Sequence, residues 1–459
     1  MSLSQRHKIG DQGTNEYILT YSAVLYIVIL LPLAADITLG IAGMKFGLGG
    51  LSVGEMLRGV IFLGGILFLA RGMDRVDWIL ALGSLTLALL LELSIVTNIK
   101  LFELGSELNI LLKLFFTPVF AFVIYYAVRA DPSLNKSVQN AMVGYGTIIS
   151  LTVIIPVLLG VAKSTYQERS ASTLKGIFSS PNDGALALVV SLAITVALAL
   201  ERRSKWLFAA SASIFVALML WGSRIAVFGS VLVPLAVTIE YVLFMGNSRN
   251  IDPTEKAQVQ RRRRQIVLAI IAFCLLGTGF AVQKVMSDPY IVLKWRSLLN
   301  PTAEEMMAGM GRLYNARAAF TSFEERGLVK NLTGVGVAEF ESRIYQIGNP
   351  GPERTDTKKR VEIDWIDLIG YYGIPFSLLV HAAYIYILYL LWRIYRKSQQ
   401  FRFFGYFFAL LFFLAHSLIA GHALLRPLPG GAIFPAIGLG LYEIRQQKRI
   451  ASGAPTTGT

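Results

Sequence analysis

Charged side chains are scarce in this chain of 459 residues. They make up 16% of the sequence, whereas hydrophobic residues make up 54%. Ordinary soluble domains have about 25% charged residues. The composition therefore excludes a soluble globular domain and indicates a polytopic membrane protein.

Cysteine and histidine are also rare. The one cysteine, Cys274, lies in an apolar run, which excludes a disulfide within the chain and a cysteine-based metal site. The four histidines are too scattered to predict a zinc cluster. No dense set of carboxylates suits Mg²⁺, so we predict neither a metal nor another cofactor. The N-terminus lacks a short apolar stretch followed by a small-residue cleavage site, so we expect no removed signal peptide.

Acidic residues are fewer than basic ones, and the net charge is +14. Such a charge can indicate nucleic-acid binding. However, cytoplasmic loops of membrane proteins collect Lys and Arg, and this explains the excess more simply. We therefore predict membrane lipids, and no nucleic acid, as partners.

Long apolar runs are abundant. About twelve of them approach the ~20 residues that a membrane-spanning helix needs. They lie near residues 17–38, 53–70, 77–97, 109–128, 141–162, 184–201, 205–222, 225–245, 265–285, 367–392, 403–420 and 430–444.

The loops between these runs predict the orientation. Basic residues concentrate in alternate loops, for example Arg261 to Arg264, which places both termini in the cytoplasm. The chain then divides into spans 1–9 (1–285), an outer loop (286–366), spans 10–12 (367–445) and a cytoplasmic tail (446–459). The short connection 222–224 is expected to be a tight outer hairpin.

The outer loop is a long polar segment. An apolar stripe predicts a helix over 303–326, which could lie on the membrane face or pack on the bundle. Arg312 and Arg317 are about 140° apart on a regular helix, so both cannot face one ligand squarely. Gly334-Val335-Gly336 predicts a tight turn with a close backbone approach.

Three carboxylates close this segment in the sequence Glu362-Ile-Asp364-Trp-Ile-Asp367. Asp364 and Asp367 are three residues apart and could share a helix face. Acidic residues in a first helical turn also stabilise the helix dipole, which explains both of them without catalysis. Glu362 precedes the helix, so that explanation covers it less well.

Polar residues also mark the outer ends of several spans. Capping explains Asn182 or Asp183 about as well as catalysis does. Arg224 could extend to lipid headgroups or bind phosphate. A histidine at a helix end, such as His422, is more often structural. The remaining candidates at this face are Arg58, Arg360 and Arg426.

The order of these motifs resembles the bacterial O-antigen ligase and Wzy-type polysaccharide polymerase superfamily. The resemblance rests on S-P-N-D-G before a helix (Pro181, Asn182), G-S-R after one (Gly222 to Arg224) and a long outer loop. Within that loop lie G-R-x-x-x-x-R, G-V-G-x-x-x-F and a polar pair before Y-Y-G-I. Ligases of this superfamily typically have a His-Asn pair where this chain has Glu362, and E-x-D-x-x-D is closer to the polymerases.

The resemblance implies an all-α integral membrane protein of GT-C-like architecture, with short helices in a large periplasmic loop of the bacterial inner membrane. It implies an inverting glycosyltransferase that polymerises polyprenyl-pyrophosphate-linked oligosaccharide at the outer leaflet, with a chain-length regulator as a possible partner. A ligase transferring the glycan to lipid A-core is the alternative. The candidate bases are Glu362 and Asp364. The candidate pyrophosphate ligands are Arg224, Arg312, Arg317 and Arg426, with weaker substrate roles for Asn182, His422, Arg58 and Arg360.

Functions of other classes remain open. A transporter of lipid-linked or anionic substrates explains the helices but not the long outer loop, and the two halves show no similarity. A peptidoglycan glycosyltransferase of the rod-shape type and a non-catalytic scaffold are further alternatives.

Overall fold

A computed structural model of the chain describes residues 53–72, 104–164, 174–178, 181–246, 311–348, 360–419 and 421–452, with isolated positions in 26–37 and 261–287. Within these ranges every named element is a helix, and the only β feature is an isolated bridge between Ser164 and Leu174. The prediction of an all-α protein is therefore confirmed for the part of the chain that is described.

Nine described helices coincide with predicted spans. They are α2 (Val53–Gly72), α4 (Leu104–Ala130), α5 (Leu134–Leu158), α6 (Pro181–Arg202), α7 (Lys205–Trp221), α8 (Arg224–Gly246), α15 (Ile374–Ser398), α16 (Arg402–Ile419) and α17 (Pro427–Ala451). The predicted spans at 17–38, 77–97 and 265–285 lie wholly or mostly outside the described residues.

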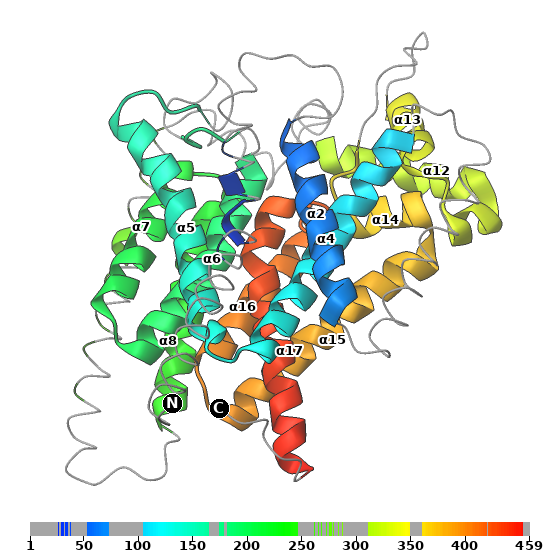
Figure 1. Cartoon of the computed structure of the whole chain (residues 1–459). Helices are drawn as coiled ribbons and strands as arrows, with labels where there is room; N and C mark the ends of the chain where they lie inside the picture. Colours follow the sequence, from blue (N-terminus) through cyan, green and yellow to red (C-terminus); the bar gives the residue numbers. More distant parts are fainter. Residues whose placement is uncertain are drawn as a thin grey trace.

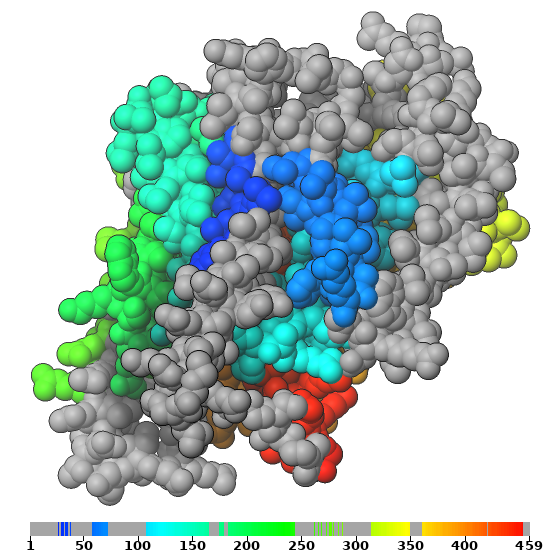
Figure 2. Space-filling view, viewed as in Figure 1, coloured from blue at the N-terminus to red at the C-terminus, as the bar shows by residue number. Residues whose placement is uncertain are grey.

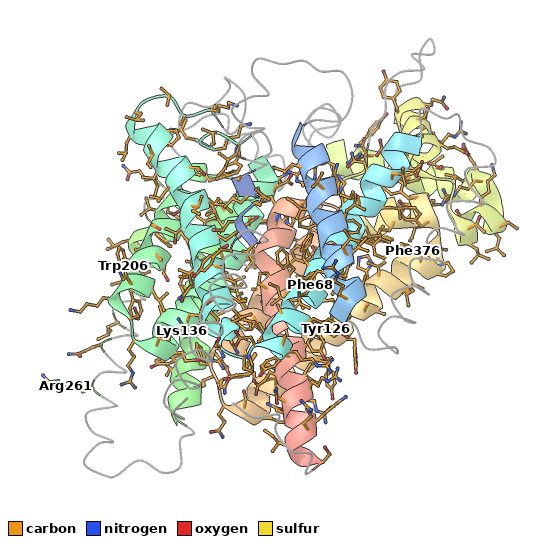
Figure 3. The ribbon with its side chains drawn as sticks, viewed as in Figure 1. Phe68, Tyr126, Lys136, Trp206, Arg261 and Phe376 are labelled. Carbon is orange, nitrogen blue, oxygen red and sulfur yellow. The ribbon has the colours of Figure 1, made fainter. Side chains whose placement is uncertain are left out.

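Six of the described helices are long and apolar enough to cross a membrane. They are the apolar stretches of α4, α5, α6, α8, α15 and α16, and α7 is a shorter apolar helix. Trp206 at the start of α7 is 82% exposed and points away from the bundle, as expected of an aromatic residue at a membrane interface (Figure 3). The structure thus supports a membrane protein with several spanning helices.

The bundle is built around α6 and α17. The apolar window of α6 is 94% buried, and α17 packs against α4, α5, α6, α15 and α16. Helix α2 lies over α4 on one face of the molecule (Figure 2). Close packing depends on small residues: a Cβ added at Gly438 of α17 would lie 2.5 Å from the carbonyl oxygen of Ala121 in α4.

The hairpin between α7 and α8 is as short as its sequence predicts. Gly222 adopts a left-handed conformation (φ 62°) at the end of α7, and its N–H donates to the carbonyl of Leu218 at 3.3 Å. The hydroxyl of Ser223 accepts a hydrogen bond from the N–H of Ala226 in the first turn of α8. The predicted tight hairpin at 222–224 is therefore confirmed.

The polar segment forms three further helices, which we call the cap: α12 (Gly311–Thr333), α13 (Val337–Gly348) and α14 (Asp364–Tyr372). In Figure 1 the cap lies at one end of the bundle, and the C-terminal end of α17 lies at the other. Helix α12 packs against α13, α14 and α15, and α13 packs against α4 and α14.

One predicted helix boundary in this region is wrong and one is confirmed. The span predicted at 367–392 is two helices, because Gly373 adopts φ 88° and separates α14 from α15. A Cβ there would lie 2.1 Å from the carbonyl oxygen of Leu332, so only glycine fits. The helix predicted over 303–326 does end at residue 326, because Gly327 is non-helical (φ 76°), and a second helical segment follows to Thr333.

The predicted tight turn at Gly334-Val335-Gly336 is confirmed. Both glycines have positive φ, 79° and 85°. The N–H groups of Val335 and Gly336 donate to the carbonyls of Gly370 and Tyr371 at 3.1 and 3.0 Å. The turn therefore ties the end of α12 to the C-terminal end of α14, which carries the residues described next.

Candidate functional site

Asp364, the first residue of α14, is completely buried beneath the connection between α16 and α17. Its carboxylate accepts hydrogen bonds from the N–H groups of Ala423 and Leu424 at 2.7 and 2.9 Å, and it lies 3.3 Å from Nδ1 of His422. Burial raises the pKa of Asp364, but the contact with His422 and the two backbone donors outweigh burial, so the pKa is held below its ordinary value. This carboxylate is therefore ionised and fixed in position.

Asp367 lies one turn further along α14 on the same side. It is also completely buried, and its two oxygens accept from the N–H groups of Val361 and Glu362, each at 3.2 Å. One oxygen is 3.7 Å from Nδ1 of His422. Burial, with added repulsion from Asp364 and Glu341, raises the pKa of Asp367 to about 7 against the opposing effects of His422 and Val361 N–H. The prediction that Asp364 and Asp367 share a helix face is confirmed.

His422 connects these two carboxylates. Because an ionised carboxylate only accepts hydrogen bonds, Nδ1 of His422 is the donor to Asp364. In the neutral imidazole, that bond fixes the tautomer and leaves the lone pair on Nε2. Nε2 is buried and has no hydrogen-bond partner among the described residues. An imidazole held by a carboxylate in this way can accept a proton from a substrate hydroxyl placed against Nε2.

A cationic group lies at the end of the same connection. Arg426 is the N-cap residue of α17, and its Nε lies 3.5 Å from a carboxylate oxygen of Asp183 in the first turn of α6. Arg58 of α2 is buried and interacts electrostatically with both Asp183 and Arg426. Two guanidinium groups against one carboxylate leave a net positive charge, which suits a phosphate-bearing ligand.

The start of α17 is rigidly placed, which in turn positions Arg426. The hydroxyl of Tyr145 in α5 donates to the carbonyl of Leu428 at 2.6 Å, and the first turns of α17 are buried. Gly431 leaves space for that tyrosine, since a Cβ there would lie 2.6 Å from its hydroxyl oxygen. The residues from His422 to Arg426 therefore present an acid–histidine group and an arginine group from one short, fixed connection.

The other predicted acidic and basic residues of this region have different surroundings. Glu362 is half-buried and adopts φ 64°, a strained conformation for a residue with a side chain. Arg360 forms an ion pair with Glu341 at 2.6 Å, and Glu341 also accepts a hydrogen bond from Tyr371 at 2.9 Å. Burial lowers the pKa of Arg360, but the opposing effects of Tyr371 and Glu341 are larger. The pKa is therefore raised overall, and the guanidinium stays charged.

The remaining predicted site residues are placed as follows. Arg317 is exposed on α12, where the neighbouring residues Asn315 and Ala316 are buried. Arg224 and Asn182 are half-buried at the starts of α8 and α6. Arg312 belongs to α12, and its side chain lies outside the described part of the structure. The described interactions thus join Asp364 with His422, and they bring Arg58 and Arg426 to the same carboxylate, Asp183. They also add Asp367 and Glu341.

Sequence reasoning contained a signal for two of these added residues. Asp367 follows Asp364 at a helical spacing, and Asp183 is adjacent to Asn182 in the S-P-N-D-G motif. Helix capping explains Asp183 and the helix dipole explains Asp367, and neither explanation requires a partner side chain. Glu341 had no signal, because its partners Arg360 and Tyr371 are distant in the sequence. A side chain that is buried only by tertiary contacts leaves no local pattern.

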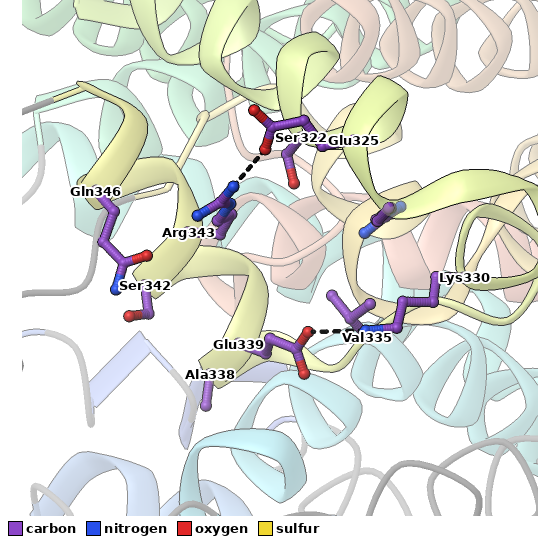
Figure 4. Close-up of a pocket in the computed structure, with 10 residues that line it drawn as sticks. Ser322, Glu325, Lys330, Val335, Ala338, Glu339, Ser342, Arg343 and Gln346 are labelled. Atoms are coloured by element: carbon purple, nitrogen blue, oxygen red, sulfur yellow. Dashed lines mark hydrogen bonds and ion pairs between the residues drawn. The ribbon is translucent and has the colours of Figure 1, made fainter.

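A polar cavity of about 510 Å³ lies between α12 and α13 (Figure 4). Two ion pairs border it, Arg343 with Glu325 and Lys330 with Glu339. Arg326 holds the cavity wall to α14, because its guanidinium donates to the carbonyls of Ile369 and Gly370 at 3.3 and 3.4 Å. Among the described residues, no group of three or more His, Cys, Asp or Glu side chains could hold a metal ion.

Comparisons of the chain with protein-family models, with curated proteins and with solved structures find no match.

Proposed function

We propose that this protein is a membrane glycosyltransferase that polymerises polyprenyl-pyrophosphate-linked oligosaccharide, with its active site on the outer side of a bacterial inner membrane. One observation carries the proposal. The connection between α16 and α17 holds His422 against Asp364 at one end and Arg426 beside Asp183 and Arg58 at the other. A base and an anion-binding group are the two things that transfer from a pyrophosphate donor requires.

The proposed reaction uses these residues as follows. Nε2 of His422 removes the proton from an acceptor hydroxyl, and that oxygen attacks the anomeric carbon of the donor. The bond from that carbon to the pyrophosphate oxygen breaks, and the electron pair leaves with the pyrophosphate. Arg426 and Arg58 stabilise the developing charge. Asp364 orients His422 and does not itself bind substrate.

Glu362 remains a second candidate for the base. Its strained backbone conformation (φ 64°) is held by the hydrogen bond from its own N–H to Asp367, and strained residues occur often at functional sites. Substitution distinguishes His422 from Glu362. Replacing the residue that acts as the base should lower the rate of transfer about 10²- to 10⁴-fold. Arg224, Arg312 and Arg317 remain candidates for additional pyrophosphate contacts, and Asn182 and Arg360 for contacts with substrate.

The test is elongation by the purified full-length protein in detergent, with a polyprenyl-pyrophosphate-linked oligosaccharide as both donor and acceptor. We expect longer lipid-linked products for the wild-type protein, and loss of them for His422→Ala. Arg426→Lys should lower the rate about 10²- to 10³-fold, because the lysine cannot form paired hydrogen bonds to phosphate. The matched control is Arg393→Lys, because Arg393 is exposed and lies near the C-terminal end of α15.

The same assay separates the rival functions. Transfer only to a lipid A-core acceptor would support the ligase. Movement of substrate across vesicles that depends on a gradient, without any new glycosidic bond, would support a transporter and overturn the proposal. Full activity of His422→Ala together with loss in Glu362→Gln would move the base from His422 to Glu362.

A further inference from the structure

Helix α12 exposes an apolar surface although it belongs to the polar cap. After the break at Gly327, Leu328, Val329 and Leu332 are 72%, 73% and 43% exposed. Phe320, before the break, is 47% exposed. The spacing of the first three residues places them on neighbouring parts of one helix face. We call Leu328, Val329 and Leu332 the α12 patch. Large apolar groups gathered on a surface in this way mark an interaction site.

The α12 patch adjoins a helix that is itself apolar and exposed. Helix α15 packs against α12, and the carbonyl oxygen of Leu332 lies 2.1 Å from the position that a Cβ of Gly373 would occupy, directly before α15 begins. Helix α15 is a candidate membrane span, yet only 28% of its apolar window is buried. Leu378 and Leu379 in its first turns are 64% and 54% exposed.

Aromatic residues also lie on α12 and α14. The rings of Phe320 and Trp365 are 6.2 Å apart, and the indole N–H of Trp365 donates to the carbonyl of Leu418 near the end of α16. Tryptophan with its polar edge satisfied and its ring beside apolar groups is typical of the boundary between acyl chains and headgroups. Lys330 lies between the patch residues in the sequence, but its side chain turns to Glu339 of α13, 3.8 Å away.

We propose that the α12 patch lies in the interfacial layer of the bilayer, with lipid as its partner. The occupant is argued from continuity: the patch extends the exposed apolar surface of α15, and an exposed face of a spanning helix contacts lipid. The α12 patch thereby anchors the cap.

Anchoring α12 would also set the depth of α14. Arg326 lies directly before the break at Gly327, and its guanidinium binds the carbonyls at the end of α14. Asp364 and Asp367, at the start of α14, are then held near the headgroups, where the phosphates of a lipid-linked molecule lie. The membrane contact itself does not rest on the proposed function, because a transporter or scaffold with this cap would contact lipid in the same way.

The experiment is depth-dependent quenching in the full-length protein. Cys274, the single cysteine, is first replaced (Cys274→Ser), and one cysteine is then introduced at Leu328 or Val329 and labelled with an environment-sensitive fluorophore. The matched control is Gln346→Cys on α13, an exposed position that lines the polar cavity. The proteins are reconstituted in phosphatidylcholine vesicles, with and without a lipid that carries a spin label close to the headgroup.

We expect quenching at least threefold stronger at positions 328 and 329 than at position 346. Equal quenching at all three positions would overturn the proposal. So would blue-shifted emission at 328 and 329 without quenching by the labelled lipid, because a second copy of the chain or another protein would then cover the patch. The assay does not measure glycosyl transfer, so its failure and the failure of the proposed function are distinguishable.

Discussion

The protein has two regions, the bundle around α6 and α17 and the cap of α12 to α14. Their buried side chains are stabilised by different interactions. Side chains inside the bundle are mainly apolar, as in the part of α6 between Ala185 and Val190, where every residue is fully buried. In the cap the buried residues include Glu341, Asp364 and Asp367. The hydrophobic effect and packing act without direction, whereas each buried carboxylate needs donors at particular positions. The cap should therefore tolerate fewer substitutions than the bundle, residue for residue.

The largest expected loss of unfolding free energy in this comparison follows the replacement of Glu341. Replacing it with alanine leaves the guanidinium of Arg360 and the buried hydroxyl of Tyr371 without their acceptor. Removing one member of a buried ion pair costs about 3–5 kcal/mol of unfolding free energy. The measurement is unfolding by SDS in mixed micelles, with wild-type protein as the reference.

A fully buried bundle residue provides the control. Ile433→Val in α17 removes one methylene at a fully buried position and should cost about 0.5–1.5 kcal/mol. Glu341→Gln should fall between the two variants, because the amide oxygen still accepts from Tyr371. If Glu341→Ala costs no more than Ile433→Val, the proposed difference between cap and bundle is wrong.

The next effect concerns pH and is confined to the cap. Since burial raises the pKa of Asp367 from 3.8 to about 7, the folded protein binds more protons than the unfolded chain between these values. The contribution of Asp367 to the stability of the fold should therefore be greatest below about pH 4, and it is lost as the pH rises to about 7. Thermal unfolding in detergent from pH 5 to 8 measures it.

The variant Asp367→Asn isolates this contribution. Its melting temperature should change less than that of the wild-type protein between pH 5 and 8, because the group that takes up the proton is gone. Asp367 interacts electrostatically with Asp364, His422, Glu341, Arg360 and Tyr371. The same scan on His422→Ala shows how much of the slope belongs to the histidine. Parallel wild-type and Asp367→Asn curves would show that Asp367 does not titrate in this range.

The same difference explains what could be predicted from the sequence. Apolar runs located the nine described bundle helices, since a run of suitable length has few alternatives in a membrane. The Gly334-Val335-Gly336 turn was predicted because glycine reports a backbone requirement directly. The division at Gly373 was missed, because the glycine lies inside an apolar run and its role depends on Leu332, far away in the sequence.

The candidate site was predicted less completely for a related reason. Asp364, His422, Arg58 and Arg426 were candidates because charged or polar residues near helix ends are conspicuous. The pairing of Asp364 with His422 was not predicted, since it depends on how the connection between α16 and α17 folds over α14. Pairing also changes the roles: a carboxylate with three donors around it is better suited to orient a base than to act as one.

A third and smaller effect tests the packing of the bundle. Gly144 and Gly146 are two residues apart in α5, yet a Cβ at Gly144 meets nothing within 4 Å and one at Gly146 would lie 2.5 Å from Cβ of Ser191. Gly146→Ala should cost about 1–3 kcal/mol through overpacking, whereas Gly144→Ala should be neutral or slightly stabilising. Unfolding in SDS compares the two, and equal values would mean that α5 and α6 are less tightly packed than described.

The smallest effect is expected at an ion pair of the cap that is exposed to solvent. Lys330 and Glu339 are 3.8 Å apart, and their side chains are 58% and 59% exposed. Exposed pairs contribute about 0–1 kcal/mol, so Glu339→Gln should leave the unfolding free energy almost unchanged, in contrast to Glu341→Gln two residues along the same helix. Unfolding curves of Glu339→Gln and Glu341→Gln, measured side by side, test whether burial, rather than charge, makes the cap sensitive to substitution. Equal losses at the two positions would show that charge matters in the cap irrespective of exposure, because the substitution is chemically identical at both.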